Sequence, residues 1–353
     1  MKWIPSCIIA ALMFCAPLHR ASAAFSSIYV FGDSVSSMTD SPGGLIYYGN
    51  RYSNGRVWVE VLAQRQGLTL TNSQNLSFYG HDTPKLLTNA SNFIAPVDVA
   101  TALVVVWVNN ADIVFDIAAI PAPYDSSDIP AWTNRLNVTL SNYSTAIQTL
   151  HTKGVRAIVA PNAADVTKAP YYNMSAADEA FVRQRTIEFN AAFVSRMNQL
   201  QSSLSNLTII VPDLFTLIDN LVAQPTAYGF TNSTGDALDD LSNTSFTGPG
   251  TNFLFWDYLN PSAKMHEILA DTTQAVLAPA RLTGVTPVNG SNQLSVVNLP
   301  VGLSGFVEGT TSLTNWAPTQ SFNSTNAAQS ILVPASGPKQ FYRLRFPFAW
   351  SWP

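Results

Sequence analysis

The run TALVVVWV (101–108) is the feature that most restricts how this chain can fold. It is continuous and almost wholly apolar, and four of its eight residues are valines. A strand buried on both faces has this composition, whereas a strand with one face in water alternates apolar and polar residues. Such strands belong to parallel sheets covered by helices on both faces, so the run predicts the centre of an α/β fold.

The rest of residues 26–278 alternates in the way that such a sheet requires. Three further β-branched runs predict strands at 26–31, 155–160 and 207–212. Longer segments with apolar residues at helical spacing predict helices at 57–67, 136–154, 176–200 and 262–278. The alternation predicts a parallel sheet with helices on both sides. In such sheets the ligand site lies beyond the carboxyl ends of the strands.

The sequence changes character after Pro279. From about residue 284 the helical periodicity ends, and short alternating runs are separated by Gly, Pro, Asn and Ser. Residues 284–353 are therefore predicted to form a small β-rich domain. They contain no His, and Glu308 is their only acidic residue. We expect packing, binding or surface attachment from this domain rather than catalysis.

The first 23 residues are predicted to be a signal peptide. Lys2 is followed by a short apolar run and by Ala21-Ser22-Ala23, which has the pattern of a cleavage site. Cleavage there would also remove Cys7 and Cys15, the two cysteines of the chain. We therefore expect a secreted protein without disulfides or cysteine-based metal sites, in which residues 24–280 form the main domain.

Charged residues are scarce, at 11% of the chain against roughly 25% in an average globular protein. The 18 basic residues include Lys2 and Arg20, so 16 remain beside 22 acidic residues after cleavage, for a net charge of −6. No basic cluster occurs, so a nucleic-acid partner is not expected. No second long apolar run follows, so no integral membrane segment is expected in the mature chain.

The sequence FGDSVSS (31–37) directly follows the first predicted strand. A serine in a tight, glycine-containing turn beyond a parallel strand would expose its hydroxyl at the edge of the sheet where ligands bind. Ser34 is therefore a candidate nucleophile. Taken alone, the motif is a weak signal, and a turn serine that caps the next helix fits it better.

Four later segments follow this motif in order. They are YYGNRYSNGRVWVEVLAQ (47–64), APNAADV (160–166), VPDLFTLIDNLVAQPTAYGFTN (211–232) and FLFWD (253–257). Together with FGDSVSS they resemble the GDSL/SGNH hydrolases, in their secreted esterase and lipase branch, over about residues 26–280. The resemblance implies a three-layer, flavodoxin-like α/β fold and ester hydrolysis by a serine nucleophile, for which no metal or other cofactor is expected.

The resemblance also assigns the oxyanion donors. Gly80, in NLSFYGHDT (75–83), matches a glycine whose backbone N–H helps to hold the negative oxygen of the tetrahedral intermediate. The next block of the family reads G-x-N-D, and its asparagine amide is a further donor. Here the strand ends VVVWVNNADIVF (104–115), so the amide would come from Asn110 or Asn109, of which we favour Asn110.

The last block of the family is D-x-x-H followed by proline, and FWDYLNPSAKMH (255–266) departs from it at one position. Asp257 matches the aspartate, but Asn260 stands in place of the histidine. The aspartate normally orients the imidazole, which takes the proton of the serine. An amide has no pKa near 7 and cannot take that proton. Asn260 would instead suit a helix N-cap, with Pro261 as the first helical residue.

Two other histidines are possible displaced bases. His81 directly follows Gly80, so it could act as a base or contact the substrate, although a loop histidine bonded to its own neighbours is the simpler interpretation. His266 lies six positions beyond Asn260, roughly 9 Å along a helix axis, whereas proton abstraction requires about 3 Å. Packing beside the apolar face of the helix therefore fits His266 better.

The sequence leaves two functions open. The first is a secreted serine ester hydrolase that acts on a lipid, acyl or acetylated-carbohydrate ester, in which Ser34 and Asp257 work with an atypical base or a water-assisted route. The second is a catalytically inactive protein of the same fold that recognises an ester or a glycan.

Overall fold

The computed structural model describes residues 25–346 apart from residues 42, 243–244, 336 and 338–339. The predicted signal peptide (1–23) and residues 347–353 lie outside the described residues.

The main part of the chain contains a four-stranded parallel sheet of β1 (Ile28–Gly32), β2 (Leu103–Trp107), β3 (Ala157–Val159) and β4 (Thr208–Ile210). Its α-helices are α1 (Trp58–Arg65), α2 (Thr83–Asn92), α3 (Asn109–Ala119), α4 (Ile129–Thr152), α5 (Ala176–Ser203), α6 (Leu214–Ala223), α7 (Ala237–Asp240) and α8 (Ala263–Leu277). Its 3-10 helices are η1 (Ser34–Ser36), η2 (Asn72–Gln74), η3 (Val166–Lys168), η4 (Pro225–Tyr228) and η5 (Pro249–Asn252). A separate parallel pair is formed by β5 (Asn232–Asp236) and β6 (Phe253–Phe255).

The strand order of the main sheet indicates where a ligand site is expected. The four strands lie in the order β1-β2-β3-β4. Residues 75–78 run beside the free edge of β1, where the backbone N–H of Leu76 donates to Val30 O at 2.8 Å and that of Phe78 to Gly32 O at 3.2 Å. This segment comes between β1 and β2 in the chain, so the spatial order is the 2-1-3-4-5 order of the flavodoxin-like fold. The switch point of that order lies between β1 and β2.

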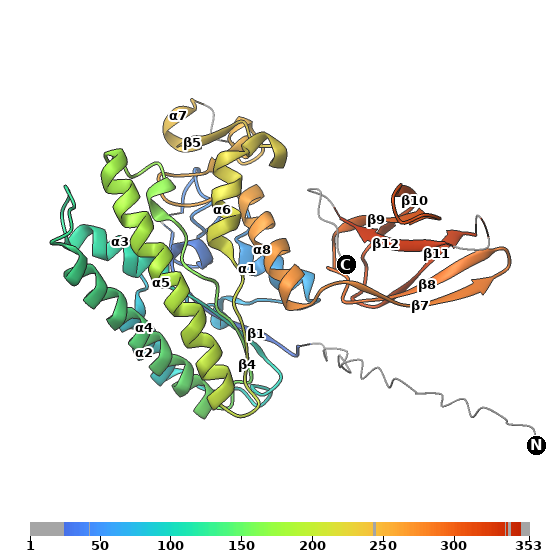
Figure 1. Ribbon diagram of the computed structural model, residues 1–353, viewed down its shortest axis with the longest axis horizontal. Helices are drawn as coiled ribbons and strands as arrows, with labels where there is room; N and C mark the ends of the chain where they lie inside the picture. The colour runs from blue at the N-terminus through green and yellow to red at the C-terminus, as the bar shows by residue number, and fades with distance from the viewer. Residues whose placement is uncertain (1–24, 42, 243–244, 336, 338–339, 347–353) are drawn as a thin grey trace, which may run out of the picture.

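Helices cover both faces of the sheet (Figure 1). The core on one face joins α1, α6 and α8 to the sheet, and the core on the other joins α2, α4 and α5. All five residues of β2 are buried, because this strand lies inside the sheet and carries helices on both sides. The predicted three-layer parallel α/β fold is thus confirmed.

The C-terminal part is β-rich, as predicted, and begins at Arg281. Its strands are β7 (Arg281–Val288), β8 (Ser291–Val297), β9 (Ser304–Thr310), β10 (Ala317–Asn323), β11 (Gln329–Pro334) and β12 (Phe341–Arg345). They form two antiparallel sheets, in the orders β10-β9-β12 and β11-β8-β7, which share one apolar core. Glu308 is buried there and paired with Arg343 at 2.7 Å and Arg345 at 3.2 Å, which makes it a structural residue.

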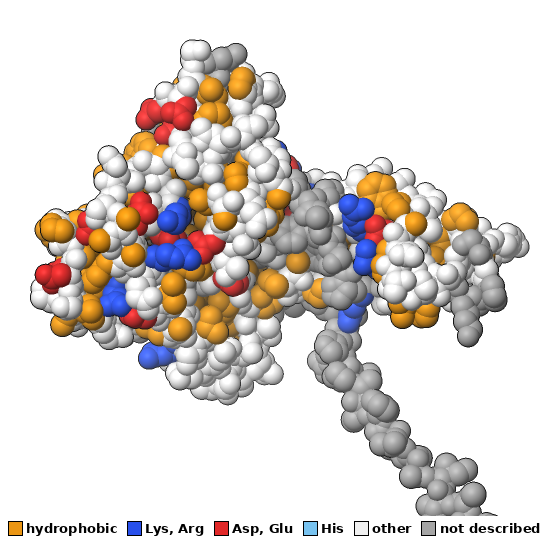
Figure 2. All heavy atoms as spheres, turned by 45° about the horizontal axis from the view of Figure 1, so that its top comes forward, with side chains coloured by type: hydrophobic (Ala, Val, Ile, Leu, Met, Phe, Trp, Pro, Cys, Tyr) orange, Lys and Arg blue, Asp and Glu red, His pale blue; other side chains and the backbone are white. Residues whose placement is uncertain are grey.

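Charged residues make up only 11% of the chain. On the face shown in Figure 2, the basic and acidic side chains stand in small groups among uncharged residues. Over the described ranges, no helix combines the length and apolar character needed to cross a membrane.

Candidate active site

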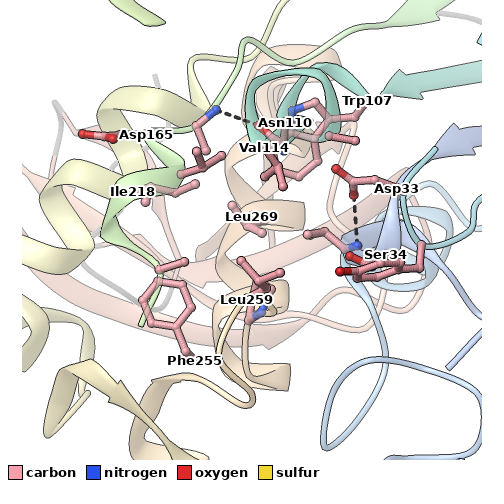
Figure 3. Close-up of a pocket in the computed structure, with 18 of the residues that line it drawn as sticks. Asp33, Ser34, Trp107, Asn110, Val114, Asp165, Ile218, Phe255, Leu259 and Leu269 are labelled. Atoms are coloured by element: carbon pink, nitrogen blue, oxygen red, sulfur yellow. Dashed lines mark hydrogen bonds between the residues drawn. The ribbon is translucent and has the colours of Figure 1, made fainter. Parts of the chain in front are cut away.

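A pocket opens at the carboxyl ends of β1 and β2, which is the switch point of the sheet. Ser34 follows β1 and Asn110 follows β2, and both line the pocket together with Gly80. Figure 3 shows Asp33 and Ser34 on one side of the pocket and Ile218 and Asp165 on the other. The cavity volume is about 110 Å³. The structure therefore brings three of the residues singled out from the sequence around one cavity.

The turn that presents Ser34 requires glycine and aspartate at fixed positions. A Cβ atom on Gly32 would lie 2.5 Å from the Cβ of Ser36, so only glycine allows η1 to fold back so tightly after β1. Asp33 caps η1 by accepting the backbone N–H of Val35 at 3.0 Å. Burial raises the pKa of Asp33 to about 7, although hydrogen bonds from Val35 and from the Asn110 amide lower it in part. The two sequence motifs thus meet through Asp33 and Asn110.

Gly80 lies in a tight turn in which the backbone N–H of His81 donates to Phe78 O at 3.2 Å. Its φ of +69° lies in the left-handed region, which strains other residues. A Cβ atom there would also lie 3.3 Å from the ring of Phe115, another residue of the pocket wall. Glycine therefore suits this position of the pocket wall, because it adopts the left-handed conformation without strain.

The structure distinguishes between the two asparagines after β2. Asn110 lines the pocket, and its Oδ1 accepts the backbone N–H of Ala164 at 2.9 Å, which fixes the orientation of its amide. Asn109 is fully buried outside the pocket lining and donates its amide to Pro161 O at 3.1 Å. Of the two amides, only that of Asn110 lies where it could serve a bound ester.

Asp112, the next acidic residue along the chain, points elsewhere. Its carboxylate accepts the backbone N–H and the hydroxyl of Thr83, at 3.0 and 2.7 Å, and the hydroxyl of Thr139 at 3.2 Å. It therefore joins α3 to the start of α2 and to α4. Burial raises its pKa to about 7.

Asn260 pairs with Asp257 instead of capping a helix. Its Nδ2 donates to both carboxylate oxygens of Asp257, at 2.9 and 3.1 Å. Its backbone carbonyl accepts the N–H of Trp256 at 2.8 Å, which closes a turn after β6. The N-cap of α8 is Ser262, so the expectation that Asn260 caps this helix with Pro261 at its first position was wrong. The turn leaves Asn260 two residues before the cap.

Asp257 has both of its oxygens occupied. Besides the Asn260 amide, it accepts the backbone N–H groups of Leu259 at 2.9 Å and Asn260 at 2.7 Å, and the hydroxyl of Tyr47 at 3.0 Å. Burial raises the pKa of Asp257, and these hydrogen bonds lower it in part. Tyr47 was not among the predicted site residues, although the segment 47–64 that contains it was recognised as part of the family pattern.

The amide of Asn260 repeats only half of what an imidazole would do. A histidine would donate one ring N–H to Asp257, as Nδ2 of Asn260 now does, and would offer its second nitrogen to the serine. Asn260 ends instead in Oδ1, which is buried and has no hydrogen-bond partner among the described residues. An amide oxygen accepts a hydrogen bond but does not take up a proton near pH 7.

His81 is fully buried and both of its ring nitrogens are engaged. Nδ1 donates to Gly32 O at 2.9 Å, and Nε2 accepts the amide of Asn89 at 3.2 Å. The ring stacks on Phe78 at 4.3 Å. Burial lowers its pKa to about 4. His81 therefore holds the Gly80 turn against β1, and it is not part of the pocket lining.

His266 lies in the interface between α8 and α1. Its Nδ1 accepts the backbone N–H of Trp58 at 3.2 Å, and burial lowers its pKa to about 3. The third described histidine, His151, bonds to Ser205 O at 3.0 Å near the end of α4. None of the three described histidines lines the pocket, so the structure brings no imidazole toward Ser34.

The pocket wall is largely apolar. Figure 3 shows Val114, Ile218, Phe255, Leu259 and Leu269 around the cavity. Asp165 also belongs to the wall, but its carboxylate is bound by Thr167 at 2.6 Å and by Arg183 at 2.8 Å. Among the described residues, no group of three or more His, Cys, Asp or Glu could hold a metal ion. The cavity suits an uncharged acyl group.

Ser34 thus lies at the switch point of a doubly wound α/β sheet, in a pocket that Asn110 and Gly80 also line. The model of the GDSL-like lipase/acylhydrolase family matches residues 28–273, and the chain belongs to this family. The predicted resemblance is thereby confirmed.

Individual relatives are distant. The thermolabile hemolysin of Vibrio parahaemolyticus is 21% identical over 268 residues, which are 70% of this chain and 62% of that protein. The GDSL esterase/lipase APG of Arabidopsis thaliana is 25% identical over 219 residues, or 56% of this chain and 60% of that one. The chain thus spans about three fifths of the length of these relatives. The crystal structure of a lipase/acylhydrolase from Enterococcus faecalis is also similar. The match covers 70% of this chain and 92% of that chain, with 14% sequence identity and a TM-score of 0.37.

Proposed function

We infer that the protein is a secreted ester hydrolase in which Ser34 is the nucleophile and no side chain acts as an efficient general base. Membership of the lipase/acylhydrolase family supports the reaction class. The amino-terminal sequence, with Lys2, an apolar run and Ala21-Ser22-Ala23, supports secretion. The observation that carries the inference is the Asn260–Asp257 pair, which stands at the sequence position of the family's His–Asp pair and between the pocket residues Phe255 and Pro261, while none of the described histidines lines the pocket.

The reaction would proceed in two steps. Ser34 Oγ adds to the ester carbonyl carbon, its proton passes to solvent, and the C–O bond to the alcohol breaks as the alcohol takes up a proton. Water then cleaves the acyl-serine to release the acid. The backbone N–H of Gly80 and the amide of Asn110 would bind the carbonyl oxygen as its charge develops. The acyl group would lie against the apolar wall of Val114, Ile218 and Leu269.

Both steps would be slow because each needs a proton acceptor. A positioned general base contributes about 10²- to 10⁴-fold to such a reaction. Oxyanion donors and substrate binding together still retain roughly 10³-fold acceleration over water in a serine hydrolase that lacks its triad. We therefore expect hydrolysis that depends on Ser34 and is weak beside that of a complete triad.

A second function is favoured by the same pair. Asn260 and Asp257 form a closed, buried unit in which Tyr47 also takes part. Such a unit can stabilise the turn after β6 without taking part in catalysis. The protein would then bind an ester in the pocket and leave it intact.

Hydrolysis of p-nitrophenyl butyrate by wild type and by Ser34→Ala separates these functions. The proposed hydrolase requires a wild-type rate clearly above that of Ser34→Ala. Equal rates for the two proteins, with an undiminished affinity for a non-hydrolysable ether analogue, would establish the binding protein instead. A fluorophosphonate probe that labels wild type but not Ser34→Ala supports the nucleophile independently of turnover.

A further inference from the structure

Four tyrosines that are far apart in the sequence gather beside the Ser34 pocket. We call Tyr52, Tyr79, Tyr171 and Tyr258 the tyrosine rim. The rings of Tyr52 and Tyr79 are 5.8 Å apart between centroids, and those of Tyr171 and Tyr258 are 5.5 Å apart. The two pairs adjoin each other. Burial raises the pKa of Tyr258, and the nearby Tyr79 phenol adds to this shift.

The rim belongs to the pocket entrance. Tyr79 lines the pocket itself, next to Gly80. Tyr258 stands between Asp257 and the pocket residue Leu259, and its backbone carbonyl accepts the N–H of Tyr171 at 2.9 Å. The rim therefore borders the pocket through Tyr79 and through the chain between Asp257 and Leu259.

Three of the four rings are open to solvent, whereas Tyr52 is partly buried. The exposed fractions are 49% for Tyr79, 59% for Tyr171 and 44% for Tyr258. An aromatic ring with a hydroxyl offers an apolar face for C–H groups and a polar tip for hydrogen bonds. A set of such rings, held in place beside a pocket, has the features of a binding surface.

The charges around the rim select among possible ligands. Burial raises the pKa of Tyr52 to about 12, and the nearby carboxylates of Asp40 and Asp257 add to this shift. Lys85, which donates to Gly80 O at 2.8 Å, is already paired with Asp82 at 3.1 Å. Asp40 is fixed there because its carboxylate accepts the backbone N–H of Tyr79 at 2.6 Å and its carbonyl accepts the Tyr52 hydroxyl at 3.2 Å. The acidic side chains disfavour a phosphate or sulfate ligand. A neutral polyol with C–H faces fits both the rings and the charge.

We propose that the tyrosine rim binds the sugar part of a neutral acylated carbohydrate while the apolar pocket receives its acyl chain. The part of this proposal that concerns hydrolysis rests on the proposed function, whereas the binding part does not. The substrate class would then be sugar esters whose acyl groups are longer than acetyl, because the cavity behind Ser34 is apolar and about 110 Å³ in volume.

The binding test uses octyl β-glucoside below its micelle concentration, because its ether-type linkage is not an ester and binding is measured apart from turnover. Calorimetric titration should show tighter binding of octyl glucoside than of 1-octanol to wild type. Tyr79→Ala and Tyr258→Ala should each weaken glucoside binding about three- to tenfold, the scale of one aromatic contact. They should change octanol binding less than twofold.

Tyr48→Ala is the matched control, because Tyr48 is equally exposed, at 45%, and lies outside the rim. It should leave both affinities unchanged. Equal losses of glucoside and octanol binding in the rim variants would overturn the proposal, because the tyrosines would then only shape the acyl pocket. Binding to neutral phosphatidylcholine vesicles that is lost in the rim variants, without a preference for the glucoside, would overturn it in favour of a lipid surface. Because the ligand is not hydrolysed, an inactive Ser34 leaves this test intact.

Discussion

Replacing Asn260 by histidine should convert the site into a complete triad. The amide of Asn260 lies 2.9 and 3.1 Å from the two oxygens of Asp257, so a ring N–H at this position would find the same acceptor. The prediction requires the second ring nitrogen to reach Ser34, as the histidine of a serine-hydrolase triad does. A positioned general base is worth about 10²- to 10⁴-fold in rate, or roughly 3 to 5 kcal/mol of transition-state stabilisation. Asn260→His should therefore raise kcat/KM by that factor.

The assay is the initial rate of p-nitrophenyl butyrate hydrolysis at pH 8, where an imidazole of ordinary pKa is neutral. The double variant Asn260→His with Ser34→Ala should lose the gain completely. A folded Asn260→His protein that is labelled by the fluorophosphonate probe but is no faster than wild type would refute the reasoning.

A second variant covers the case in which the larger ring at this buried position prevents folding. In wild type Asp257 has no imidazole to orient, so Asp257→Asn should change the Ser34-dependent rate less than tenfold. In a working triad the same change costs about 10⁴-fold. A loss of that size in a folded Asp257→Asn protein would mean that Asp257 supports a base, contrary to our account.

Three further outcomes are expected. Asn110→Ala should lower the Ser34-dependent rate about 10²- to 10³-fold through loss of an oxyanion donor, whereas Asn109→Ala should act on stability, because its amide serves Pro161 O. Arg65→Met should lower the free energy of unfolding, measured in urea, by about 3 to 5 kcal/mol, because it leaves the buried carboxylate of Asp271 without its partner at 2.6 Å. Burial raises the pKa of Asp112 to about 7, so the native state holds a proton that the unfolded chain has lost above about pH 4. Its contribution to stability should therefore fall as the pH rises from about 4 to 7, by on the order of a few kcal/mol, and Asp112→Asn should flatten that dependence in urea unfolding.

Each of these three predictions can be contradicted by a specific result. Equal rate losses in Asn110→Ala and Asn109→Ala would remove the distinction between the two amides. Arg56→Met is the control for the salt bridge, because Arg56 is exposed and bonds only to Gln64 among the described residues; a similar loss of stability in both arginine variants would exclude the buried pair as the cause. An unchanged pH dependence in folded Asp112→Asn would show that the carboxyl of Asp112 titrates normally.

The fold could be predicted because its signals are local. The run at 101–108 became the fully buried β2, since a strand between two helical layers has no face in water. The helices with clear periodicity were likewise predicted. The segment at 75–78 was recognised only as a family block, because its edge position depends on backbone hydrogen bonds to β1 that no pattern in the sequence reveals.

The gathering of candidate residues around one pocket could be predicted where the motif itself sets the geometry. Ser34, Gly80 and Asn110 lie at strand ends or in a glycine turn, and they line one pocket. The consequence of Asn260 could not be predicted, because a turn closed by Trp256 directs its side chain to Asp257 rather than to the helix. The contact of Tyr47 with Asp257 joins residues 210 positions apart, and such long-range contacts leave no local signal.

The tyrosine rim was missed for the same reason. Its members come from four separate loops, and each of them alone is an ordinary surface tyrosine. Only the folding of the chain brings the two ring pairs together beside Ser34.

The central claim is that Ser34 is a nucleophile without an efficient proton acceptor. Intact-protein mass spectrometry after incubation with p-nitrophenyl octanoate tests it most directly, because deacylation needs a base as much as acylation does. We predict that an octanoyl adduct accumulates slowly on Ser34 of wild type and persists, whereas in Asn260→His it forms and disappears rapidly. An adduct on another residue, or rapid turnover by wild type that is lost in His81→Gln or His266→Gln, would contradict the account.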